Sequence, residues 1–284
     1  MNDHQFEYVE GQARPGFPAL LAEYQQRSDQ VATQPGNVLD QPYGPHARQR
    51  FDLFLASGPA VGVLLYFHAG YWQSRDKAQF RFLAPFFQAR GLHFVAVNYP
   101  LCPEVSLAVL TQAVLPSVPA VRSHLASHGL GALPLVVAGH SAGGHLAAEI
   151  ALAASAEGAG VQGVLGVLGI SGVYDPEPLV ATTLNQKLLL TEDTAAQANV
   201  VRRVRPGLPP GLWVVGGAET SAFLAQNAAM HAAWQGAGNA SASVEVPEAD
   251  HFTVLGALAP DHAGMGLAFD AWWRRVHAHA QSSA

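Results

Sequence analysis

Ser141 lies among residues with small side chains in the stretch LPLVVAGHSAGGHLAAEI, residues 133–150. Residues 139–143 fit the pattern G-x-S-x-G, with an apolar run of strand type before it and a helix-like run after it. This context predicts a sharp strand-to-helix turn that projects the serine oxygen above the edge of a sheet. Ser141 is therefore the expected nucleophile, and the alternative is a serine that only caps the helix.

A nucleophilic serine needs a base, and the base needs an acid that orients it. In a sheet of this kind the chain order is serine, then acid, then histidine, with the last two after late strands. Glu219 follows the apolar run LWVVGG, and His251 follows the next run, ASVEVP. We expect Glu219 to be the acid and His251 the base. Asp250 and Asp175 are the competing acids: Asp250 is the direct neighbour of the histidine, and Asp175 follows an earlier strand.

The negative oxygen that forms during attack on an acyl group needs N–H donors. The stretch YFHAGYWQS, residues 66–74, places small residues at 69 and 70 just after an apolar run. These residues let the main chain approach the site, so the N–H groups of Gly70 and Tyr71 are the expected donors. The N–H of Ala142, at the positive end of the following helix, is the third. The alternative is an ordinary strand-end turn with aromatic packing.

These residues have to be positioned by the elements between them. Apolar runs of strand type occupy residues 61–67, 92–99, 134–139, 161–171, 212–217 and 242–247. Helix-like stretches occupy residues 76–90, 107–127, 142–154, 221–234 and 261–278. Residues 38–44 and 48–55 resemble an antiparallel pair at one edge. Alternating strands and helices predict a mostly parallel sheet of about eight strands with helices on both faces.

The 284 residues are 49% apolar and 13% charged, a composition that supports one large core. We expect a single domain over residues 1–284, with a small cap or insertion around 176–210. The net charge of −6 gives no reason to expect nucleic acid or an anionic membrane as a partner. The lone Cys102, the polar N-terminus and the lack of a long apolar run favour a soluble cytoplasmic protein. A homodimer stays an open alternative.

Nucleotide and metal sites have weak support in this sequence. No phosphate-binding G-x-x-x-x-G-K-[ST] is present, and GAGVQG, residues 158–163, follows a helix and opens a strand, the reverse of a dinucleotide site. The 13 histidines form no H-E-x-x-H, and no C-x-x-C is present. We therefore expect no metal and no organic cofactor.

The motifs HAGYW, NYPLCPE, GHSAGGH, ISGVYD and ADHF occur in this order. Together they resemble the α/β-hydrolase superfamily, and within it the kynurenine formamidase (arylformamidase) and esterase-like branch. The family's oxyanion motif H-G-G-x-W corresponds to His68, Ala69, Gly70 and Trp72, with alanine at the first glycine. Glu219 stands where the family usually has aspartate.

The resemblance implies a serine hydrolase that cleaves a small acyl amide or ester through an acyl-enzyme. An aryl formamide such as N-formylkynurenine is the expected substrate, and a small carboxylic ester is the alternative. His68, Tyr71, Trp72, His140 and Phe252 are the expected substrate contacts. A hypothesis of another class is a non-catalytic module with the same fold that binds a small molecule. Such modules typically lack one of the three catalytic residues, and all three positions are filled here.

Overall fold

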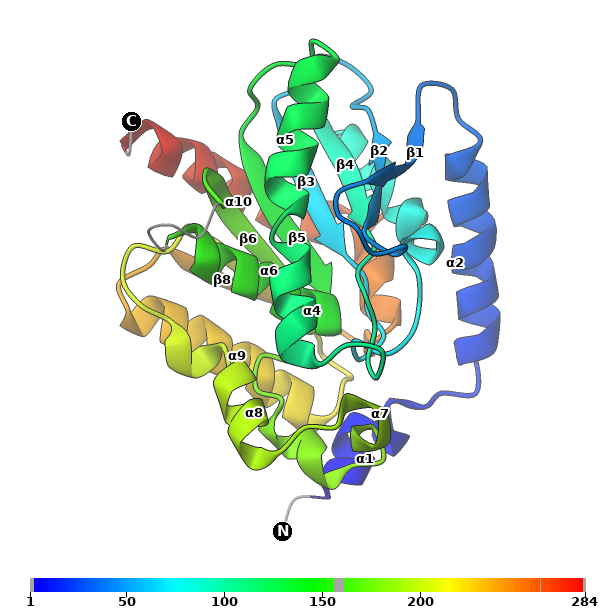
Figure 1. Ribbon diagram of the computed structural model, residues 1–284, viewed down its shortest axis with the longest axis vertical. Coiled ribbons are helices and arrows are strands. Elements are labelled where there is room, and N and C mark those ends of the chain that lie inside the picture. The colour runs from blue at the N-terminus through cyan, green and yellow to red at the C-terminus, as the bar shows by residue number, and fades with distance from the viewer. Residues whose placement is uncertain (1–2, 156–160, 261, 283–284) are drawn as a thin grey trace.

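The computed structural model describes residues 3–155, 161–260 and 262–282. Within these ranges one sheet of eight strands runs in the order β1-β2-β4-β3-β5-β6-β7-β8 (Figure 1). Its strands are β1 (Val38–Pro42), β2 (Arg50–Phe54), β3 (Gly62–Phe67), β4 (Leu92–Val97), β5 (Leu135–His140), β6 (Val164–Ile170), β7 (Gly211–Gly216) and β8 (Ser241–Val246). The pairs β1–β2 and β2–β4 are antiparallel and the others are parallel. The predicted mostly parallel sheet with an antiparallel edge is confirmed.

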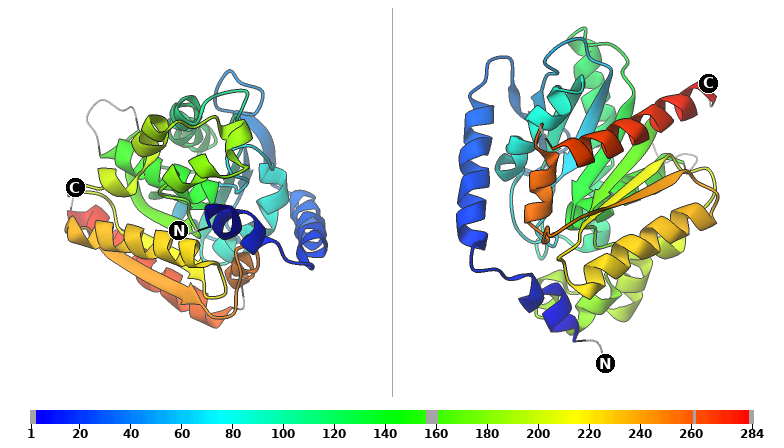
Figure 2. Two further views of the ribbon diagram at one scale, coloured as in Figure 1. Left: turned by 90° about the horizontal axis from the view of Figure 1, so that it is seen from below. Right: turned by 180° about the vertical axis from the view of Figure 1, so that it is seen from behind.

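The central strands are buried on both faces, which explains their continuous apolar sequences. In β3 the side chains alternate: Val63 and Leu65 join one core, and Leu64 and Tyr66 join the other. The first core lies under α4 (Leu107–Val114), α5 (Ser117–Ser127), α6 (Ala142–Ala154) and α9 (Ser221–Gly236). The second lies under α2 (Phe17–Ala32), α3 (Ala84–Gln88), α10 (Ala263–Ser282) and the 3-10 helices η2 (Lys77–Leu83) and η5 (Thr253–Leu258). Figures 1 and 2 show these two layers from the front and from behind.

Two predicted helices are interrupted, and a proline explains each break. Residues 76–90 form η2 followed by the short α3, because Pro85 lacks the N–H that a continuous α-helix needs there. Residues 107–127 divide into α4 and α5 at Pro116, for the same reason. The predicted strand 161–171 begins at Val164. The start of the glycine pattern 158–163, and Asp261 of the last predicted helix, lie outside the described residues.

Helix α2 was not among the predicted elements. Tyr24, Ser28 and Val31 are its buried residues, spaced by four and three positions along one face. Pro18 in its first turn is an additional start signal. No helix within the described ranges is long and apolar enough to cross a membrane.

The segment 176–210 lies between β6 and β7. It contains η3 (Glu177–Ala181), α7 (Asn185–Leu188), α8 (Glu192–Ala198) and η4 (Val201–Arg203). The N-terminal helix α1 (His4–Tyr8) packs beside η3 and α9 (Figure 2), and Gln5 Nε2 donates to Thr183 Oγ1 at 3.2 Å. A role for this segment as a cap stays a prediction.

A buried cluster of charged groups ties the antiparallel edge to η2. Asp52 on β2 is fully buried, and its carboxylate accepts from Lys77 Nζ at 2.7 Å and from Arg81 Nη2 at 2.7 Å. The backbone N–H of Asp40 donates to the same carboxylate at 2.8 Å. Lys77 is only 2% exposed, and its charge is balanced by Asp52 and by the more exposed carboxylate of Asp40, which accepts from Lys77 Nζ at 2.7 Å.

Replacing Asp52 by asparagine removes the buried negative charge, so Arg81 faces a neutral amide and Lys77 keeps only the Asp40 carboxylate. We expect the Asp52→Asn substitution to lower the free energy of unfolding by about 3–5 kcal/mol. Urea unfolding followed by circular dichroism measures this, with the exposed Asp29 on α2 as the control site. The Asp29→Asn variant should differ from wild type by less than about 0.5 kcal/mol. Equal unfolding midpoints for the two variants would contradict the account.

His68, directly after β3, is a second buried polar group. Its Nδ1–H donates to the carbonyl oxygen of Ala69 at 2.7 Å, and its ring stacks on Tyr99 with centroids 4.3 Å apart. Burial lowers the pKa of His68 to about 4, from the ordinary 6.5. Burial also lowers the pKa of His140 well below 6.5. Both rings are therefore neutral in the folded protein at pH 7.

Between pH 6.5 and about pH 4 the unfolded chain binds a proton at position 68 that the folded protein does not. The contribution of His68 to stability is therefore complete above pH 6.5 and is lost as the pH falls, by at most ~3 kcal/mol. We predict that the free energy of unfolding falls less steeply from pH 7 to pH 4.5 in the His68→Gln variant than in wild type. Denaturant unfolding at a series of pH values measures both slopes, and equal slopes would refute the prediction.

Candidate active site

The strand β5 leads directly into α6 (Figure 1), and Ser141 is the single residue between the last residue of β5, His140, and the first of α6, Ala142. Its backbone is left-handed, with φ 56° and ψ −118°, a conformation that residues other than glycine rarely adopt. The Ser141 N–H donates to the carbonyl oxygen of Ile170 on β6 at 2.8 Å, which anchors the turn to the sheet. Within the described chain its side chain forms no capping hydrogen bond with α6. The hydroxyl is therefore not used as a helix cap.

The glycines on either side of Ser141 are required by space. A Cβ atom on Gly139 would overlap the carbonyl oxygen of Gly143, and one on Gly143 would overlap the carbonyl oxygen of Phe67 on β3. Both overlaps involve backbone atoms, which cannot move without disturbing the sheet. The G-x-S-x-G pattern thus reflects the close passage of α6 over the ends of two strands.

His251 and Glu219 are brought together as the sequence predicts. Glu219 follows β7 and His251 follows β8, and His251 Nδ1 lies 2.7 Å from Glu219 Oε2. The other carboxylate oxygen, Oε1, accepts from the backbone N–H of Gly216 at 2.8 Å and from the hydroxyl of Ser171. Both Glu219 and His251 are buried. Glu219 is therefore fixed at both oxygens, and its charge faces the imidazole.

The two competing acids have other partners. The carboxylate of Asp250 accepts from the backbone N–H groups of Phe252 and Thr253 at 2.9 and 2.8 Å, which closes a local turn. These hydrogen bonds help to lower the pKa of Asp250. Asp175 accepts from the N–H of Glu177 at 2.9 Å, and burial raises its pKa. The carboxylate that accepts the hydrogen bond from His251 Nδ1–H belongs to Glu219.

The loop after β3 has an unusual backbone. Gly70, Tyr71 and Trp72 have φ values of 126°, 49° and 56°, and a Cβ on Gly70 would overlap the carbonyl oxygen of Ser74. The N–H groups of Gly70, Tyr71 and Ala142 find no acceptor in the described parts of the chain. Strain of this kind, combined with free donors, is typical of functional loops.

One small pocket contains both Ser141 and His251. Its volume is about 110 Å³. The aromatic side chains that line it are Tyr24, Tyr71, Phe80 and Phe252. Gly70 and His140 also line it. Of the expected substrate contacts, the structure thus brings Tyr71, His140 and Phe252 to the serine.

His68 and Trp72, the other two expected substrate contacts, do not line this pocket. Both are fully buried. The left-handed backbone turns Trp72 into the core, where it packs edge-on against His145 with ring centroids 5.1 Å apart. His68 stacks between Tyr99 and Phe80. We infer that both residues support the loop after β3 by packing in the core beneath it.

His140 supports the base. Its Nε2 lies 2.7 Å from the carbonyl oxygen of His251, and the two rings are 4.7 Å apart. Burial, followed by the nearby His251, lowers the pKa of His140, so the ring is neutral and Nε2–H is the donor. This hydrogen bond fixes the backbone of the loop that carries His251.

Two parts of the site were missed by the sequence analysis, and both come from the N-terminal region. Helix α2 supplies the wall residue Tyr24, whose hydroxyl donates to the carbonyl oxygen of Phe252 at 3.0 Å. Glu7 accepts from Ser221 Oγ at 2.8 Å and from the Ala222 N–H at 2.9 Å, so it caps the first turn of α9. Glu7 and the residues that it contacts are more than 200 positions apart in the sequence, so no local sequence pattern predicts these contacts.

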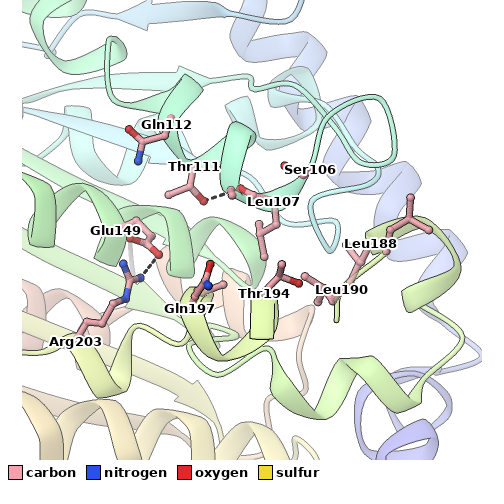
Figure 3. Close-up of a pocket in the computed structure, with 13 residues that line it drawn as sticks. Ser106, Leu107, Thr111, Gln112, Glu149, Leu188, Leu190, Thr194, Gln197 and Arg203 are labelled. Carbon is pink, nitrogen blue, oxygen red and sulfur yellow. Dashed lines mark hydrogen bonds and ion pairs between the residues drawn. The ribbon is translucent and has the colours of Figure 1, made fainter. Parts of the chain in front are cut away.

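A roomier pocket, of about 260 Å³, lies elsewhere on the molecule (Figure 3). It is bounded by α4, α6 and the segment that contains α7 and α8. The figure shows Glu149 paired with Arg203 at one end and Leu188 and Leu190 at the other. Neither Ser141 nor His251 lines it. The volume of a pocket therefore does not by itself identify the candidate active site. Among the residues that the structure describes, no cluster of three histidine, cysteine or acidic side chains suits a metal ion.

The comparisons with known proteins agree with this geometry. A family model described as the α/β-hydrolase fold matches residues 64–255. The kynurenine formamidase of Danio rerio is 30% identical over 232 residues, which cover 79% of this chain and 78% of that protein.

Solved structures show the same fold. A protein from a Silicibacter species, described as a candidate thioesterase, superposes with a TM-score of 0.83 at 29% identity, covering 95% of this chain and 100% of the other. Esterase B from Lactobacillus rhamnosis gives a TM-score of 0.71 at 19% identity, covering 95% and 99%. The chain therefore belongs to the α/β-hydrolase family, and it is a hydrolase of the kynurenine formamidase and esterase-like branch.

Proposed function

We propose that this hydrolase cleaves a small acyl amide or ester, with Ser141 as nucleophile, His251 as base and Glu219 as the orienting acid. The observation that carries the proposal is the shared pocket. Ser141 and His251 line one cavity, and His251 Nδ1 is hydrogen bonded to a buried carboxylate. That arrangement leaves Nε2 as the nitrogen that can accept a proton.

The residues support a sequence of four steps. His251 takes the proton of Ser141 as the oxygen attacks the acyl carbon, and the Glu219 carboxylate stabilises the imidazolium. The N–H groups of Gly70, Tyr71 and Ala142 stabilise the developing oxyanion. His251 then gives its proton to the leaving amine or alcohol as the acyl C–N or C–O bond breaks, and the acyl group stays on Ser141. In the third step His251 takes a proton from a water molecule as the water oxygen attacks the acyl carbon. In the fourth, His251 returns this proton to Ser141 Oγ as the bond between Oγ and the acyl carbon breaks and the acid leaves. In every step His251 is the residue that takes up or releases the proton.

We propose an aryl formamide such as N-formylkynurenine as the first substrate to test. The aromatic pocket walls and the kynurenine formamidase relative support this choice. A cavity of about 110 Å³ favours a small acyl group. A small carboxylic ester is the second candidate, because the same nucleophile and N–H donors can act on an amide and on an ester bond.

The cytoplasm is the proposed location of the protein. The lone Cys102 is buried and forms no disulfide, which suits a reducing compartment.

Removal of the nucleophile tests the first assignment. The Ser141→Ala substitution should lower kcat by about 10⁴-fold or more, because the three residues act as a unit. Turnover of N-formylkynurenine and p-nitrophenyl acetate measures the loss, and circular dichroism checks the fold. The surface variant Ser127→Ala is the matched control. More than about a tenth of wild-type kcat in Ser141→Ala would exclude Ser141 as nucleophile.

Substitution of the acids tests the second assignment. The Glu219→Gln variant should lose about 10²- to 10⁴-fold in kcat, because a neutral amide cannot stabilise the imidazolium. Glu219→Asp should also be impaired, since the shorter side chain withdraws the carboxylate from His251. Asp250→Asn is the matched control and should be far milder, because the carboxylate of Asp250 accepts from the N–H groups of Phe252 and Thr253 and not from the ring of His251. If Asp250→Asn is as damaging as Glu219→Gln, the role of Glu219 is wrong.

A further inference from the structure

Arg75 is the one permanent cation among the described residues that line the pocket of Ser141 and His251, and no carboxylate lines it. The aliphatic stem of Arg75 lies against the loop that carries the free N–H groups. A Cβ atom added to Gly70 would be only 2.9 Å from Cγ of Arg75. A positive charge is thus placed at the wall of the pocket, beside the proposed reaction centre.

The charge of Arg75 is not compensated by the protein. No hydrogen bond or ion pair joins its guanidinium to any residue in the described ranges. The adjacent Asp76 is already committed, since it pairs with Arg48 at 3.3 Å and accepts from the N–H of Ala78 at 3.0 Å. Burial lowers the pKa of Arg75, which indicates that the group is partly withdrawn from water. An arginine in this state gains most from an anionic partner.

The position of Arg75 is also constrained. Its φ of 75° is left-handed, in a loop (residues 68–76) that already holds three left-handed residues at 70–72. Its guanidinium carbon lies 5.6 Å from the ring centre of Phe17, which in turn packs on Phe252 at 3.7 Å. Backbone and ring contacts together hold the side chain at the pocket without neutralising it.

We propose that Arg75 binds a carboxylate of the substrate, so that the site selects acyl amides and esters that carry an anionic group. The inference rests on the proposed function, because it places the substrate in the pocket of Ser141. Among the described residues no acidic side chain lines this pocket, so of the two charges on N-formylkynurenine only the carboxylate has a partner of opposite charge here. The favoured class is therefore an anionic aryl formamide or ester. The competing explanation is that Arg75 only packs on Phe17 to complete the pocket wall.

Substrates matched in all but charge test this inference. Formanilide is neutral, and 2-, 3- and 4-formamidobenzoate each add one carboxylate at a different place on the ring. For the best isomer, kcat/KM in the wild type should exceed that of formanilide by about 10- to 100-fold, the range for hydrogen bonds to charged groups. The Arg75→Gln substitution should bring this ratio close to one. Arg75→Lys, which keeps the charge without the planar fork, should give an intermediate ratio.

A distant arginine supplies the control. Arg274 is exposed on α10 and does not line the pocket, and its substitution by glutamine makes the same change in net charge. The Arg274→Gln variant should keep the wild-type ratio. If wild type hydrolyses both kinds of substrate with a ratio near one, or if Arg75→Gln keeps a high ratio, the inference is overturned while the proposed function stands.

Binding measurements separate the inference from turnover. Calorimetry with the Ser141→Ala protein should show benzoate binding at least about 10-fold more tightly than benzamide. This difference should disappear in the Ser141→Ala, Arg75→Gln double variant. A protein that hydrolyses no formamide or ester contradicts the proposed function, whereas the benzoate measurement still decides the role of Arg75. Equal binding of benzoate and benzamide to the Ser141→Ala protein would overturn it.

Discussion

The left-handed backbone of Ser141 holds the serine above the carboxyl edge of the sheet, and the surrounding packing leaves no room for side chains at positions 139 and 143. The turn is strained, and it persists because the sheet fixes it through the hydrogen bond from Ser141 to Ile170. Every other part of the site is positioned relative to this turn. The loops after β3, β7 and β8 open at the same edge because those strands are parallel to β5 and β6.

The N-terminal segment connects these loops to one another. Tyr71 in the loop after β3 donates its hydroxyl to the carbonyl oxygen of Tyr8 at 2.5 Å. Gln12 donates to Thr220 Oγ1, directly after Glu219, at 2.7 Å. Arg14 lies 3.9 Å from Asp250, directly before His251. A short stretch of chain thus contacts the oxyanion, acid and base loops, which favours a fixed geometry over a mobile one.

The sequence predicted the parts of the site that follow buried strands. Ser141 and Glu219 follow the buried strands β5 and β7, whose sequences are continuous apolar runs. His251 follows the partly buried edge strand β8, and its place was predicted from the chain order of the three catalytic residues. The sequence did not predict α2, whose apolar face is narrow, nor the contacts of Glu7, which depend on residues more than 200 positions away. It also did not indicate that Trp72, an expected substrate contact, is fully buried against His145. Tyr71 and Trp72 both have a positive φ, which turns the side chain of Trp72 inward. A positive φ is expected at glycine, so the residue types at these two positions do not predict it.

The central claim is that the turn presents an activated serine, and covalent labelling measures this most directly. A fluorophosphonate probe reacts with a serine only when a base and an oxyanion site activate it. Intact-mass and peptide mass spectrometry should show one adduct per chain, located on Ser141 and absent from the His251→Ala variant. Folded protein that takes up no probe, or that is labelled at another residue while Ser141 stays free, would contradict the account.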